Sequence, residues 1–236
     1  LAGGAVQAFN AETLESLWVF KDTLGGQPNC TIQYSDGYIY TGFWNSETKD
    51  ANFVCVSATD EDPDNPTETK YATWTYAVQG GFYWAGAYVT DKYAIVGSDD
   101  GESDSTSDSS YVYCFDKLTG EVVQKVGPHH GDIRSDISYY DGRIYFTSKG
   151  GYLYSYNLKE DGTIDTENLI EPIEIGKMST STPAIANGRC YVGSSYGSNF
   201  SGTYGISVVD INEETGAMSL EYVVYTDAYP QTSGVV

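Results

Sequence analysis

The sequence is poor in basic residues, and this shortage limits the partners that it can have. Its 236 residues include 12 Lys and Arg against 33 Asp and Glu, which gives a formal net charge of −21. A negative field of this size repels phosphate backbones and anionic lipid headgroups. We therefore expect no nucleic-acid partner.

Long apolar runs and clustered cysteines are also missing. No stretch reaches the roughly 18 consecutive apolar residues of a membrane helix, so we expect no membrane span, and no basic N-terminal region precedes an apolar signal segment. Any export signal or anchor is expected outside this sequence. Cys30, Cys55, Cys114 and Cys190 lie far apart, without the spacing of a zinc or redox site. They are predicted to be buried, reduced thiols.

Aromatic residues and glycine are abundant instead. The chain has 22 Tyr, 8 Phe, 4 Trp and 26 Gly. This composition favours pleated strands joined by tight turns over helices, so it indicates an all-β fold.

Two short motifs alternate along the chain. The first is a strand, a polar turn and a second strand, which begins at Ala5, Tyr111, Tyr152 and Ile206, with an expanded copy from Phe53. The second is a hairpin that occupies Ile32–Gly42, Ala87–Gly97, Ile137–Ser148 and Ala184–Ser194. Asp36-Gly37, Asp141-Gly142 and Asn187-Gly188 stand at hairpin centres, where a type I′ turn needs two residues with positive φ, and Asp91-Lys92 is the imperfect member.

One copy of each motif makes a unit of four antiparallel strands, and a period of about 40 to 50 residues is typical of propeller blades. We therefore predict a single all-β domain, a β-propeller or propeller fragment over 1–236, with complete blades at about 28–77, 81–127, 132–176 and 179–225. Residues before Lys21 and from Tyr229 to Val236 would supply two partial blades. The recurring Gly-His and Trp-Asp signals of WD40 blades are missing.

This pattern resembles the repeats of the quinoprotein alcohol dehydrogenase-like propellers (PQQ-type repeats), most clearly at Phe115–Gly120 and Ala184–Ser194. The resemblance covers nearly the whole chain. It departs at Ser57–Lys70, where the turn is expanded, and in the later blades, where Val123, Ile173 and Tyr222 stand near the place of a Trp. Dehydrogenases of this family hold their quinone with adjacent cysteines and a calcium site, which this sequence does not match. We expect no pyrroloquinoline quinone and no other bound cofactor, with calcium as the alternative that stays open.

Four blades and two partial ones leave the closure of the ring open. The outer strands before Lys21 and the strand after Tyr229 could form a composite fifth blade. The alternative, which we favour, is a fragment of a larger ring that is completed by the rest of its own propeller or by a partner.

Candidate ligand-binding residues come from the loops that lead into the innermost strands, because these loops converge on the channel of a propeller. Counting back seven residues from the Asp or Asn of each hairpin selects one residue per blade, and neighbouring aromatic and histidine residues extend the group. The predicted set is Asn29, Tyr83, Trp84, His130, Arg134, Thr180, Tyr229 and Gln231.

Two further clusters could bind a metal ion. His129 and His130 are the only histidines, but adjacent strand residues point to opposite faces, so an exposed loop pair is the simpler interpretation. The acidic loop with Asp99, Asp100 and Asp104 offers clustered oxygen ligands of the kind that calcium prefers, although it does not fit the EF-hand spacing. A solvated insertion is the alternative for this loop.

These observations favour a non-catalytic binding or scaffolding module that recognises a protein, peptide or glycan. Composition and the resemblance together predict an extracellular or cell-surface location. An enzyme with a site at the channel mouth, a quinoprotein-like oxidoreductase or a hydrolase, and a structural spacer remain alternatives.

Overall fold

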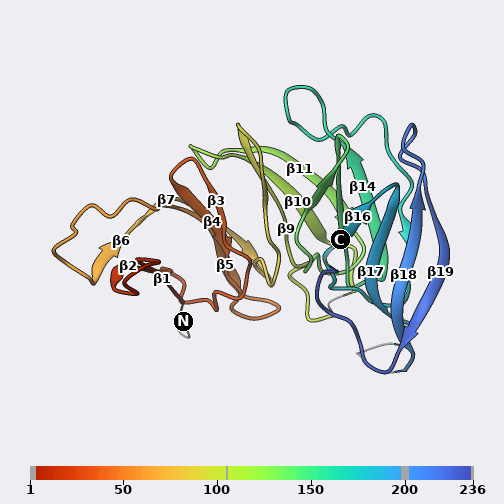
Figure 1. Cartoon of the computed structure of the whole chain (residues 1–236), viewed down its shortest axis with the longest axis horizontal. Helices are drawn as coiled ribbons and strands as arrows, with labels where there is room; N and C mark the ends of the chain where they lie inside the picture. The colour runs from red at the N-terminus through yellow and green to blue at the C-terminus, as the bar shows by residue number, and fades with distance from the viewer. Residues whose placement is uncertain (1–3, 105, 198–201, 235–236) are drawn as a thin grey trace.

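A computed structural model describes residues 4–104, 106–197 and 202–234. All regular secondary structure in these ranges is β-strand. The strands form five sheets that follow one another in chain order (Figure 1). Four of the sheets are four-stranded and antiparallel. The predicted all-β architecture of propeller blades is confirmed.

Each blade is built from consecutive hairpins, apart from one strand that joins another sheet. The N-terminal sheet contains β1 (Ala5–Phe9), β2 (Ser16–Lys21) and β6 (Glu68–Lys70). The first blade contains β3 (Gln33–Ser35), β4 (Tyr38–Gly42), β5 (Asp50–Ser57) and β7 (Ala72–Gln79). The second contains β8 (Tyr88–Val89), β9 (Tyr93–Gly97), β10 (Ser110–Asp116) and β11 (Val122–His129). The third contains β12 (Ser138–Tyr140), β13 (Arg143–Thr147), β14 (Tyr152–Asn157) and β15 (Ile173–Glu174). The fourth contains β16 (Ala184–Ala186), β17 (Arg189–Ser195), β18 (Tyr204–Ile211) and β19 (Met218–Thr226).

The expanded acidic turn of the first blade differs from the prediction. The segment Ser57–Lys70 is not a loop throughout. Its last residues form β6, which pairs in parallel with Trp18 to Phe20 of β2. A loop of this length can reach back to the preceding sheet, and the Lys70 ammonium contacts the carboxylates of Glu61 and Glu68 there. The sequence pattern predicted only antiparallel neighbours and missed this pairing.

The hairpin turns adopt the predicted conformation. φ is 50° at Asp36, 47° at Asp141 and 52° at Asn187, and the glycine after each also has a positive φ. Asp and Asn tolerate this region better than other residues with a side chain, and glycine adopts it freely. These turns join the two inner strands in the first, third and fourth blades.

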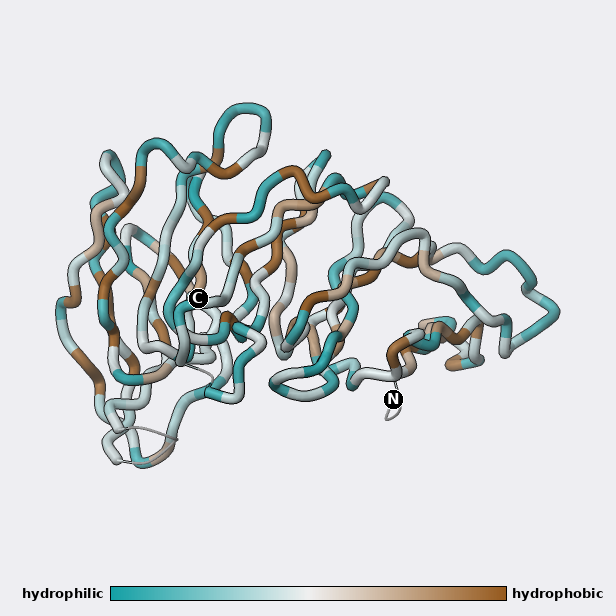
Figure 2. Tube along the Cα trace, turned by 180° about the vertical axis from the view of Figure 1, so that it is seen from behind, coloured by the Kyte–Doolittle hydropathy of each residue, from teal (hydrophilic) through white to brown (hydrophobic). Residues whose placement is uncertain are grey.

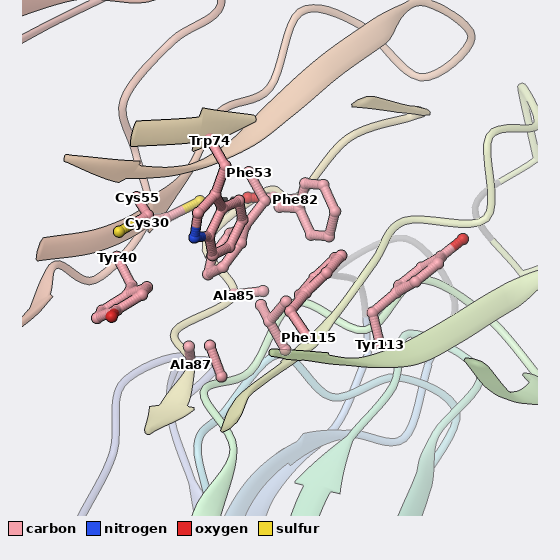
Figure 3. Close-up of a cluster of buried hydrophobic side chains, with 12 residues drawn as sticks. Cys30, Tyr40, Phe53, Cys55, Trp74, Phe82, Ala85, Ala87, Tyr113 and Phe115 are labelled. Atoms are coloured by element: carbon pink, nitrogen blue, oxygen red, sulfur yellow. Dashed lines mark hydrogen bonds between the residues drawn. The ribbon is translucent and has the colours of Figure 1, made fainter. Parts of the chain in front are cut away.

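The core lies between the sheets. One cluster joins the first blade, through Phe53 and Trp74, to the second blade, through Tyr113 and Phe115 (Figure 3). Similar clusters join each of the other neighbouring pairs of sheets. Figure 2 shows hydrophobic residues along the strands and hydrophilic ones on the loop between β5 and β6. Packing of successive sheets therefore buries most of the apolar side chains.

Side chains of one sheet also donate hydrogen bonds to backbone carbonyls in the outer turn of the following sheet. Trp18 donates from Nε1 to the carbonyl of Ala58, and Trp74 donates from Nε1 to the carbonyl of Lys117 at 2.9 Å. In the third blade the guanidinium of Arg143 has this role, because it donates to the carbonyls of Glu213 and Glu214. The later blades can therefore lack the tryptophan and keep the junction.

All four cysteines are free and buried, as predicted. Cys190 lies opposite Ile185 in the fourth blade, and the equivalent positions of the other blades hold Ile39, Ala94 and Ile144. The exposed fraction of Cys190 is zero. Burial raises the pKa of the Cys190 thiol to about 12. The thiol is therefore protonated and behaves as a small apolar side chain.

Candidate functional site

A cavity of about 360 Å³ opens where the loops before the innermost strands converge. Asn29, Trp84, Arg134 and Thr180 line it, and each stands four residues before the strand that begins at Gln33, Tyr88, Ser138 or Ala184. The other lining residues are Thr31, Asp136, Thr182, Gln231, Thr232 and Ser233. The structure thus brings five of the eight predicted residues to one cavity.

A second layer of the cavity comes from residues two positions before the same strands. The hydroxyl of Thr31 donates to both carboxylate oxygens of Asp136, at 3.0 and 3.1 Å. The backbone N–H of Asp136 donates to the hydroxyl of Thr182 at 2.9 Å. At Gly86, the corresponding position of the second blade, a Cβ would lie 2.2 Å from the Asp136 carboxylate. Only glycine leaves room for that carboxylate there.

Trp84 has a strained backbone and an aromatic support. Its φ is 61°, which is uncommon for a bulky residue and marks a conformation that the surroundings must hold. The indole stacks on Tyr83 at 4.5 Å between ring centroids, and Tyr83 stacks on Trp44 at the same distance. Tyr83 therefore supports Trp84 and does not itself line the cavity.

Arg134 is surrounded by carboxylates. Its guanidinium contacts Asp99 from Nη2 and Nε at 2.7 and 3.1 Å, and Nη2 lies 2.7 Å from Glu47. Asp132 Oδ2 lies 2.8 Å from Nη2 without the angle of a hydrogen bond, so this contact is an ion pair. The Tyr83 ring centroid lies 4.7 Å from Cζ, within cation–π range. The arginine therefore joins residues from three blades.

The two fully buried carboxylates of this cluster resist ionisation. Burial raises the pKa of Asp132 to about 7, although Arg134 opposes this change. Burial and the neighbouring Asp132 raise the pKa of Asp99 well above its usual value. Arg134 favours the charged form of both carboxylates against this burial, and the Lys149 ammonium, 3.5 Å from Asp132 Oδ2, adds to the effect at Asp132.

One oxygen from each of Glu47, Asp99 and Asp132 lies within 4.8 Å of the others, so these three carboxylates, two of them buried, could hold a metal ion. Of the predicted metal ligands only Asp99 belongs to it. Asp100 accepts hydrogen bonds from Glu102 and Ser107 of its own loop, and Asp104 binds Thr106. Nη2 of Arg134 already lies within 2.8 Å of an oxygen of each of the three carboxylates.

The structure places the remaining predicted residues differently. The Tyr229 hydroxyl accepts a hydrogen bond from the Thr180 backbone at 2.8 Å, so it positions a lining residue. His130 lies at a separate surface cavity with Tyr152, Glu174 and Lys177, and its Nδ1 is 2.6 Å from Asp108. His130 is therefore not part of the channel-mouth group.

The sequence pattern predicts that His129 and His130 form an exposed loop pair, and this prediction is wrong for His129. This side chain is buried among the rings of Phe146, Tyr154 and Tyr156, and its Nε2 lies 2.9 Å from the Tyr156 hydroxyl. It is the last residue of β11, so its neighbour His130 points the other way. Burial lowers the pKa of His129 to about 4.

We expect His129 to make the fold less stable in mild acid. Its folded-state pKa of about 4 lies below the ordinary value of 6.5. The unfolded chain therefore takes up a proton first as the pH falls, and stability is lost below about pH 6.5. Linkage gives roughly 2 kcal/mol of lost unfolding free energy between pH 7.5 and pH 5. Urea unfolding of the wild type and of His129→Gln should show this difference in pH dependence, and parallel profiles would contradict it.

Sequence reasoning missed Glu47, Thr31 and Thr182 as members of the site. Thr31 and Thr182 carry a usable signal, because they stand at the same repeat position as Asp136, two residues after the predicted ones. Glu47 lies in the loop between β4 and β5, to which the repeat assigns no place. Its contact with Arg134 joins positions 87 residues apart.

Solved structures similar to this chain are propeller-type proteins of low sequence identity. BamB from Moraxella catarrhalis matches with a TM-score of 0.63 and 17% identity over 97% of this chain and 60% of its own. A putative 6-phosphogluconolactonase from Bacteroides fragilis matches with a TM-score of 0.67 and 14% identity over 96% and 66%. The computationally designed Ika8 protein matches with a TM-score of 0.62 and 14% identity over 98% and 59%. The chain thus spans less than two thirds of the length of each.

No protein-family model matches the sequence, and neither does any curated protein. The described residues include no helix with the length and apolar character that a bilayer span requires. At these identities the structural matches show the fold alone. The chain is thus similar to β-propeller proteins in architecture.

Proposed function

We propose that this chain is a non-catalytic binding module of the β-propeller type, which recognises a protein, peptide or glycan at the channel-mouth cavity. The observation that carries this proposal is the lining of the cavity. Each of the four blades contributes at least one residue to it, and so does the segment that includes Gln231. A concave cavity at the place where the loops converge, with polar groups from several blades directed to it, is a candidate ligand site. We further propose an extracellular or cell-surface location, on the acidic composition and the repeat type.

The geometry does not favour the catalytic alternative. Asp99 and Asp132 have the raised pKa values that a general acid would use. Both side chains are fully buried and in contact with Arg134, and neither lines the cavity. Their raised pKa values therefore come from burial within the ion-pair cluster and do not indicate a general acid in the cavity.

Trp84→Ala is expected to weaken ligand binding by about 1–3 kcal/mol, because it removes the aromatic side chain of the cavity. Binding can be measured by calorimetry with hits from an array of glycans, peptides and surface proteins. Tyr71→Ala is the matched control, since this tyrosine is 83% exposed and lies outside the cavity. A ligand that binds both variants and the wild type equally would place the site elsewhere.

A further inference from the structure

We propose that the channel-mouth cavity takes a neutral saccharide, and not an anionic ligand or a peptide side chain. This inference rests on the proposed function and adds the chemical class of the ligand. Three features of the cavity support it: the state of its arginine, the chemistry of its other lining groups, and the fixed position of its aromatic ring.

The positive charge of Arg134 is not available to a ligand. Arg134 is the one basic residue among those that line the cavity, and its side chain is 6% exposed. Its guanidinium already contacts Glu47, Asp99 and Asp132, so the carboxylates beside it offset its charge. The Asp136 carboxylate also lines the cavity. A phosphate, sulfate or carboxylate ligand would therefore enter a neutral to negative site and lose its water without a cation to replace it.

Hydroxyl and amide groups make up most of the remaining lining. Asn29 and Gln231 provide amides, and five further residues provide hydroxyls: Thr31, Thr180, Thr182, Thr232 and Ser233. These groups both donate and accept hydrogen bonds, as the hydroxyls of a sugar do. The described lining contains no aliphatic or phenylalanine side chain, whereas a pocket that buries a peptide side chain is mainly apolar.

Trp84 supplies the one flat apolar surface of the lining. A pyranose ring presents C–H groups on its faces, and burying these against an indole is favourable, while the ring's equatorial hydroxyls reach polar groups around the edge. The stack of Trp84, Tyr83 and Trp44 fixes the indole before a ligand arrives. A preformed site loses less conformational entropy on binding.

Asp136 is placed to accept hydrogen bonds from a sugar. Thr31 and the Asp136 backbone hold it in the second layer, where Gly86 leaves space for the carboxylate. Burial raises the pKa of Asp136. A carboxylate that can accept two bonds from neighbouring hydroxyls suits a diol and opposes a second anion.

The test is saturation-transfer NMR followed by calorimetry on the 236-residue chain. The probes are neutral trisaccharides of glucose, mannose, xylose and N-acetylglucosamine, their sulfated counterparts, and a panel of acidic and apolar peptides. We expect at least one neutral saccharide to bind, and its sulfated form to bind no tighter. Trp84→Ala should weaken it about ten- to hundredfold, the range for loss of an aromatic anchor. Gln231→Ala provides a second variant, and Tyr71→Ala should bind like the wild type.

The contrary outcomes separate this inference from the proposed function. A sulfated saccharide or a peptide that binds at least tenfold tighter than any neutral saccharide, and is lost in Trp84→Ala, would overturn the ligand class and leave the channel-mouth site in place. Two outcomes would contradict both the ligand class and the proposed function: no binding by any probe, or binding with an affinity that neither Trp84→Ala nor Gln231→Ala changes.

Discussion

Replacing Arg134 by methionine is expected to lower the free energy of unfolding by about 3–5 kcal/mol, the usual result of removing one partner from a buried ion pair. Methionine keeps much of the side-chain volume but leaves Asp99 without its cation, and leaves Asp132 with the more distant Lys149 ammonium at 3.5 Å. Both carboxylate side chains are fully buried, so water cannot replace the guanidinium. Urea unfolding at pH 7.5 measures the loss.

The matched control for this variant is Arg189→Met. Arg189 pairs with Asp210 at 2.9 Å, but both side chains are more than a third exposed. Such pairs contribute at most about 1 kcal/mol. A loss for Arg134→Met as small as that for Arg189→Met would show that the buried cluster adds little to stability.

The stability loss in Arg134→Met should shrink as the pH falls. Without the guanidinium, which lowers the pKa of both Asp99 and Asp132, each pKa rises further above its unfolded value. The folded state then binds protons at a higher pH than the unfolded chain, so lower pH favours folding of the variant. Unfolding at pH 5.5 should therefore show a smaller difference from the wild type than at pH 7.5.

Phe53→Ala is the second substitution with a large expected effect, about 3–5 kcal/mol of unfolding free energy. Phe53 is fully buried in the cluster between the first and second blades, and its ring lies 5.3 Å from Phe82 and 5.7 Å from Phe115 between centroids (Figure 3). The truncation removes apolar contact and leaves a cavity that surrounding rings fill only in part. Thermal and urea unfolding would both report it.

Phe9→Ala provides the comparison for this core substitution. Phe9 is 53% exposed at the end of β1. Its truncation should change stability by less than about 1 kcal/mol, because most of its surface already meets water. Equal losses in the two variants would mean that the junction between the blades does not depend on its aromatic cluster.

The repeat made much of the fold predictable. Local turn chemistry at Asp36, Asp141 and Asn187 fixes the inner hairpins, and these in turn define equivalent positions around the channel. The residues counted back from those turns, such as Asn29 and Arg134, line one cavity because equivalent positions on successive blades face the same channel. Periodicity carries this information, since each blade repeats the same strand directions.

Other features could not be predicted because they depend on contacts between different parts of the chain. β6 pairs with β2 through a loop that only one blade has. His129 looks like a loop residue, yet the rings of the third blade bury it. The repeat pattern placed Arg134 at the channel mouth but gave no sign that Glu47 and two aspartates would offset its charge there. Each of these depends on which side chains meet across blades.

The order of strands within the sheets also has a consequence for cooperativity. Apart from the β2–β6 pair, each sheet joins strands that are close in sequence, and its apolar core packs on its immediate neighbours in the chain. Polar contacts at the channel mouth, of Arg134 with Glu47 and of Asp136 with Thr31, also link the third blade to the first. Stability in such an array is approximately a sum of unit terms and nearest-neighbour interface terms. A lesion in the fourth blade should therefore loosen that blade and its junction with the third, while amide hydrogens in the first blade keep their protection from exchange.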